Sequence, residues 1–181
     1  MKTKEFLKQH SACTRGAKWA LAIGDDMADV WDALIEQGKH GWLLWTLSQP
    51  GVFSDSALRH LACRFVRETP LRDGRMVWDL LEDERSRKAI EVAELYADGK
   101  ATADELSAAR AAADAAYYAT RAAYAAYDAA CYAAYADAWS ASSYAASAAA
   151  SGAADAVYDS AYDAAYDAQI QMIAELGNPF K

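Results

Sequence analysis

The sequence predicts an all-α protein, with a compact multi-helix head followed by a long alanine-rich helical hairpin. Apolar residues recur at three-to-four spacing through the first hundred residues, and strand-like alternation of Val, Ile and Thr is nearly absent. Residues 101–181 contain 34 alanines, and alanine is the best helix former. The prolines Pro50, Pro70 and Pro179 all lie outside the helical patterns. Together these features predict helices along the whole chain.

The first helices of the head are expected to be short. Two of them are predicted at 2–9 and at 17–23. Asp25 or Asp26 can cap a third, because a carboxylate at this position accepts hydrogen bonds from the first free backbone N–H groups. A fourth, around 41–47, is apolar on nearly every side, so we expect it to be buried.

The later helices of the head have clearer boundaries. Ser54 can cap an amphipathic helix with Leu58, Leu61, Ala62, Phe65 and Val66 facing inward and Arg59, Arg64, Arg67 and Glu68 facing outward. Another helix is predicted at 84–96, with Gly99 as the residue that ends it. Thr102 and Glu105 have capping-box spacing and predict the start of the next helix.

We therefore divide the chain into a head at 1–100 and a hairpin at 101–181, packed on the head or projecting from it. One helix from residue 102 to residue 150 would be about 73 Å long at about 1.5 Å per residue, too long for a small domain. A fold-back is expected, either at 140–143 or, slightly favoured, at 151–152, where serine and glycine weaken helix.

Charge is unevenly distributed along the sequence. The formal net charge is -8, and residues 101–181 hold ten Asp and Glu against three Lys and Arg. An acidic segment does not bind nucleic acid directly, since phosphates are neutralised by clustered Lys and Arg. The distribution favours a basic protein partner, which could itself bind nucleic acid.

Three well-separated cysteines, Cys13, Cys63 and Cys131, indicate neither a disulfide framework nor a structural metal site. We expect a cytoplasmic protein with no metal and no cofactor. Neither a signal peptide nor a membrane-spanning segment is expected, because no apolar run is long enough.

The sharpest pattern in the sequence is a ladder of paired tyrosines and aspartates near the C-terminus. The tyrosines recur every four residues, and each is followed by an aspartate. In one interpretation the tyrosines pack on the head and the aspartates keep the helix edge soluble. In the other the ladder binds a partner, because tyrosine offers a large contact area with few rotatable bonds. The ladder consists of Tyr158, Asp159, Tyr162, Asp163, Tyr166 and Asp167.

A cluster of arginines in the head has two interpretations as well. It could pair internally with acids of its own helix or of the hairpin, or it could be a second binding patch for an acidic partner. The patch consists of Arg59, Arg64, Arg67, Arg72 and Arg75.

His60 and Cys63 are one helical turn apart and could in principle form a nucleophilic pair. Both lie on a predicted core helix without a recognisable oxyanion-binding motif. The favoured interpretation is therefore packing or capping, and no catalytic residues are assigned.

Two segments, LRHLACRFVRE at 58–68 and DERSRKAIEVAELYADGKATADELSAAR at 83–110, resemble a family of bacterial and phage immunity proteins. The resemblance extends over 58–116 and is strongest over 85–106. It implies a small helical head, an alanine-rich tail and protection against a toxin by binding, with no catalytic residues to transfer. Members often carry histidine in the tail, where this chain has tyrosine and aspartate.

These observations predict a non-enzymatic binding protein that neutralises another protein, either as an immunity protein or as a phage-encoded inhibitor of a bacterial defence system. Self-assembly through alanine faces is one alternative function. A second alternative is a small-ligand binder with a pocket between head and hairpin.

Overall fold

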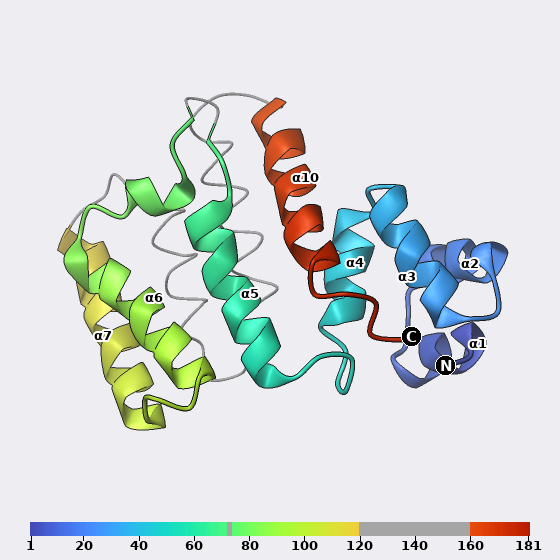
Figure 1. Ribbon diagram of the computed structural model, residues 1–181, viewed down its shortest axis with the longest axis horizontal. Helices are drawn as coiled ribbons and strands as arrows, with labels where there is room; N and C mark the ends of the chain where they lie inside the picture. The colour runs from blue at the N-terminus through green and yellow to red at the C-terminus, as the bar shows by residue number, and fades with distance from the viewer. Residues whose placement is uncertain (72–73, 120–159) are drawn as a thin grey trace.

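The described part of the chain is all α-helical, which confirms the predicted fold class (Figure 1). The computed structural model describes residues 1–71, 74–119 and 160–181, with the helical backbone alone at 114–119 and 160–163. No strand is present in these ranges, where two isolated β-bridges join Lys2 to Asp26 and Pro70 to Met76. Both candidate turns of the predicted hairpin lie outside the described residues.

Four short helices form the N-terminal part of the molecule. They are α1 (Thr3–Gln9), α2 (Thr14–Ile23), α3 (Met27–Glu36) and α4 (His40–Leu47). The Asp26 carboxylate accepts the N–H of Ala28 at 3.0 Å and so caps α3. Leu43 and Leu47 of α4 are fully buried, so the expected burial of this helix holds for one side of it. Its other large apolar residues are only partly buried, namely Trp42, Leu44 and Trp45.

Two longer helices follow, α5 (Asp55–Glu68) and α6 (Glu84–Ala97), separated by the short 3-10 helix η1 (Val77–Leu80). The Ser54 hydroxyl accepts the N–H of Ala57 at 3.2 Å and begins α5 as predicted. Apolar side chains of α5 and α6 form the centre of the core, where Leu61, Phe65 and Ile90 are fully buried. Gly99 follows α6 with φ +70°, a conformation that glycine adopts without strain.

The two described helices of the C-terminal segment occupy separate places. α7 (Ala103–Ala119) packs against α6 at one end of the molecule, whereas α10 (Ser160–Ala174) lies between α5 and α4 (Figure 1). The predicted capping box begins α7, because Thr102 Oγ1 accepts the N–H of Glu105 and the Glu105 carboxylate accepts the N–H of Thr102. Residues far apart in sequence thus build one core.

The last residues of the chain cross to α3, so that the two ends of the chain lie close together (Figure 1). Phe180 packs edge-on against Phe6 of α1, with ring centroids 5.4 Å apart, and also contacts Trp31. The Asn178 side-chain amide donates to the Ala28 carbonyl at 2.9 Å and to the Asp32 carboxylate at 2.8 Å. Lys181 pairs with the same carboxylate at 2.8 Å.

Two predictions about the head are wrong. α2 begins at Thr14, before the expected start at residue 17, because Cys13 Sγ accepts the N–H of Gly16 at 3.3 Å and acts as the cap. Arg59 does not face outward: its side chain is buried, and its guanidinium lies 5.0 Å from the centre of the Tyr96 ring. A cation over an aromatic face recovers part of the cost of leaving water.

Candidate functional site

The described part of α10 has one buried face and one exposed face. Ala165, Gln169, Ile170, Met172 and Ile173 are buried against the head. The exposed residues Asp167, Gln171 and Glu175 are four apart, so they form one stripe along the helix. α10 therefore packs on the head by its apolar face and exposes a polar stripe, in which Glu175 pairs with Arg64 and Asp167 has no ion pair among the described residues.

Tyr166, the only ladder tyrosine with a described side chain, contacts the head. Its ring stacks on His40 of α4, with ring centroids 4.2 Å apart and an interplanar angle of 24°. His40 Nε2–H donates to Gln169 Oε1 at 2.7 Å, and Gln169 Nε2–H donates to Thr69 Oγ1 at 3.4 Å. These contacts join α4, α10 and the end of α5 through Gln169, which is fully buried between them.

The remaining ladder residues are described less fully. Tyr158 and Asp159 lie outside the described residues, and the structure gives only the backbone of Tyr162 and Asp163. Asp167 is exposed beside the half-buried Tyr166. In the one tyrosine–aspartate pair that is described, the tyrosine contacts the head and the aspartate faces solvent.

An open depression of about 470 Å³ lies where α10 meets the N-terminal helices. Its lining combines two cationic side chains with aromatic rings and two glycines. The lining residues are Arg15, Gly38, Lys39, His40, Gly41, Trp42 and Tyr166. Arg15 and Lys39 make no ion pair with a carboxylate of the described residues.

Burial lowers the pKa of His40 below its ordinary value of 6.5, and the hydrogen bond to Gln169 opposes this only in part. The unfolded chain therefore takes up a proton at this position before the folded protein does. The contribution of neutral His40 to the free energy of unfolding should be fully present above pH 6.5. It should be lost as the pH falls towards the lower pKa of the folded state.

We expect His40→Gln to weaken this dependence of stability on pH. Urea denaturation of both proteins across pH 5 to 8 would measure the difference in unfolding free energy between them. As the pH falls, the wild-type protein should lose more unfolding free energy than the variant does. Parallel curves would contradict the assignment to His40.

The described arginines of the predicted basic patch differ in their surroundings. Arg64 binds Glu68 on its own helix and Glu175 at the end of α10, at 2.7 and 2.8 Å. Hydrogen bonding to Glu68 and then to Glu175 raises the pKa of Arg64. Arg67 binds Glu94 of α6 at 2.6 Å and lies over the Trp78 ring at 4.1 Å.

Two further arginines of the patch complete this description. Arg75 is exposed, and Arg72 lies outside the described residues. Arg59 is buried, and Arg64 and Arg67 join helices of the head to one another and to α10. We therefore do not assign a binding patch to these arginines.

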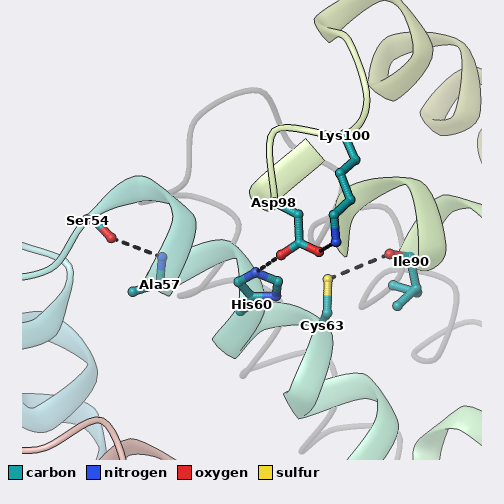
Figure 2. A network of polar contacts seen from close by, with 7 residues as sticks. All are labelled: Ser54, Ala57, His60, Cys63, Ile90, Asp98 and Lys100. Carbon is teal, nitrogen blue, oxygen red and sulfur yellow. Dashed lines mark hydrogen bonds and ion pairs between the residues drawn. The ribbon is translucent and has the colours of Figure 1, made fainter. Parts of the chain in front are cut away.

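His60 and Cys63 have different partners, as Figure 2 shows. His60 Nε2 lies 2.9 Å from Asp98 Oδ1, and Lys100 binds the other oxygen of that carboxylate at 2.8 Å. Cys63 is fully buried, and its thiol donates weakly to the Ile90 carbonyl at 3.8 Å. Burial raises the pKa of Cys63 to about 12, which keeps the thiol protonated at neutral pH. The two residues do not form a nucleophile and base.

Thiol labelling should distinguish the two described cysteines. Cys13 is exposed, whereas the buried and protonated Cys63 should react with iodoacetamide at least a hundredfold more slowly in the native protein. Peptide mass spectrometry after timed quenching would give both rates from one sample. Equal labelling rates of Cys13 and Cys63 in the native protein would contradict the burial of Cys63.

No group of His, Cys, Asp and Glu side chains within 1–71, 74–113 and 164–181 is arranged to hold a metal ion. No helix in the described part of the chain has the length and apolarity needed to cross a membrane.

Sequence reasoning did not find the contact between His40 and Tyr166. The two residues are far apart along the chain, and neither stands in a motif that names the other. No family model matches the chain, and no curated protein or solved structure shows significant similarity to it. Function must therefore be inferred from the residues of the chain itself.

Proposed function

We propose that this chain is a non-enzymatic binding protein that neutralises another protein through the acidic face of α10. The observation that supports this most is the division of α10 into a buried apolar face and an exposed stripe that includes Asp167. A helix held on one face can present its other face without reorganising, which lowers the cost of binding.

Charge supports a basic partner. The segment 101–181 carries most of the net negative charge of the chain, because its ten Asp and Glu are offset by only three Lys and Arg. Acidic side chains on such a surface speed the encounter with a basic protein and help to select it. Asp159 and Asp163 precede Asp167 at intervals of four residues, the spacing that places side chains on one face of a helix.

The chemistry of the head is consistent with binding rather than catalysis. The Cys63 thiol is protonated, and the His60 ring is paired with Asp98 instead of with a nucleophile. Two versions of the proposal fit equally well: an immunity protein that binds a toxin, and a phage-encoded inhibitor that binds a component of a defence system.

A charge-reversal experiment tests the proposal. The triple variant Asp159→Lys, Asp163→Lys and Asp167→Lys should lose capture of basic proteins from a host lysate. A matched variant, Glu5→Lys, Glu36→Lys and Glu82→Lys, changes the net charge equally at exposed positions elsewhere and should retain it. Equal capture by both variants would reject the α10 face as the binding surface.

Sedimentation velocity would distinguish the alternative of self-assembly. The alanine faces on which that alternative depends lie largely outside the described residues. A monomer at micromolar concentration is expected under the proposal, whereas a concentration-dependent oligomer would favour pairing between copies.

A further inference from the structure

An apolar pocket among α1, α2, α3 and α4 lies next to the basic depression. It has a volume of about 170 Å³ and is lined by Trp19, Trp42 and Trp45 with aliphatic side chains around them. The Trp19 and Trp42 rings are tilted against each other, with centroids 5.3 Å apart. A cavity of roughly 150 Å³ with apolar walls holds a benzene ring, so this pocket has the capacity for one aromatic ring.

Two polar side chains of the lining are bonded within the protein, and most of the pocket wall is apolar. The Thr46 hydroxyl donates to the Trp42 carbonyl at 2.8 Å, and Cys13 Sγ accepts the N–H of Gly16. A ligand group in this pocket would therefore meet apolar walls and aromatic faces. Such walls favour an apolar ring over a polar group, which would lose its hydrogen bonds to water.

Gly16 contributes to keeping the pocket open. It lies inside α2 without a positive φ, at a position where alanine would make a more stable helix. A Cβ added there would stand 3.7 Å from the Trp42 indole and 3.3 Å from Cys13 Sγ. The side chain that helix stability favours would thus reduce the space beside Trp42.

The pocket and the depression adjoin at two places. Trp42 lines both of them, and the consecutive residues Arg15 and Gly16 line one each. The depression supplies Arg15 and Lys39, neither of which is paired with a described carboxylate, and no acidic side chain lines it. A negative group seated in the depression would meet two cations and lie beside Trp42, which also lines the pocket.

We propose that this composite site binds a small aromatic carboxylate, with its ring in the tryptophan-lined pocket and its carboxylate at Arg15 and Lys39. The ring gains contact with the indoles, and the carboxylate can accept charge-assisted hydrogen bonds from guanidinium and ammonium groups. The site is built from α1 to α4 and the edge of α10, and it does not depend on the proposed capture of a protein.

The test uses 3-phenylpropionate as the probe, 3-phenylpropanamide as its neutral analogue, and calorimetry on the full chain. A ligand of this size should bind with Kd on the order of 0.1–1 mM. The amide should bind at least tenfold more weakly, since it lacks the charge. Equal binding of acid and amide would overturn the role of Arg15 and Lys39, and tighter binding of octanoate would overturn the aromatic class.

Variants assign the probe to this site. Arg15→Gln and Lys39→Gln should each weaken binding at least threefold, whereas Lys18→Gln, an equal charge change at an exposed position of α2, should alter it less than about twofold. Gly16→Leu should abolish binding. The milder Gly16→Ala should weaken it at least threefold with no loss of thermal stability, and it decides the matter if the leucine variant fails to fold. Unchanged affinity in a folded Gly16 variant would overturn the proposal.

Discussion

Replacing Ile173 with alanine should destabilise the protein by about 2–5 kcal/mol, the range for truncating a buried aliphatic side chain. Ile173 is fully buried where α10 packs into the head, so truncating its side chain leaves a cavity in the core. Urea denaturation followed by circular dichroism would measure the loss in unfolding free energy.

The matched control for this prediction lies on the same helix. Gln171 is exposed, and Gln171→Ala should change the unfolding free energy by less than about 0.5 kcal/mol. A small effect of Ile173→Ala would mean that α10 rests loosely on the head. The proposed binding face would then lack the rigid support on which the proposal depends.

Removing the ring of Phe180 should cost about 2–3 kcal/mol, although this residue is next to the last in the chain. Its ring packs edge-on against Phe6 and Trp31, and aromatic contacts of this geometry add to the apolar area that they bury. Thermal and urea unfolding of Phe180→Ala would show the loss.

Lys181→Ala is the comparison variant for that measurement. The ion pair between Lys181 and Asp32 is exposed, so its loss should cost about 0–1 kcal/mol. Equal effects of the two substitutions would indicate that the end of the chain is held by charge and not by the packing of Phe180.

The sequence predicted best where local chemistry decides the structure. Ser54, Asp26 and the pair Thr102 and Glu105 each cap a helix as expected, because a cap depends on residues within one turn. The cap at Cys13 was missed, since a thiol is an unusual acceptor at that position. The bounds of the 3-10 helix η1 were not predicted, and it begins where Asp79 accepts the N–H of Met76.

Contacts between distant segments could not be predicted in the same way. Arg59 stands at an outward position of its own helix, yet α6 covers it with Tyr96. The insertion of α10 between α4 and α5 depends on the whole fold, and so do the contact of Tyr166 with His40 and the basic depression beside it. A periodic pattern shows which face of a helix is apolar without showing which neighbour it meets.

One helix holds both ends of the chain. Met1 contacts Asp26 and the backbone of Met27 where α3 begins, and Lys181 and Asn178 bind Asp32 one to two turns further along. A short linker between residues 181 and 1 should therefore close the chain into a circle without disturbing the core. New ends could be opened in an exposed turn such as the one at Gly99 between α6 and α7. Polypeptide added at either end would emerge beside α3, so a pair of fluorophores attached there would report unfolding as a loss of energy transfer.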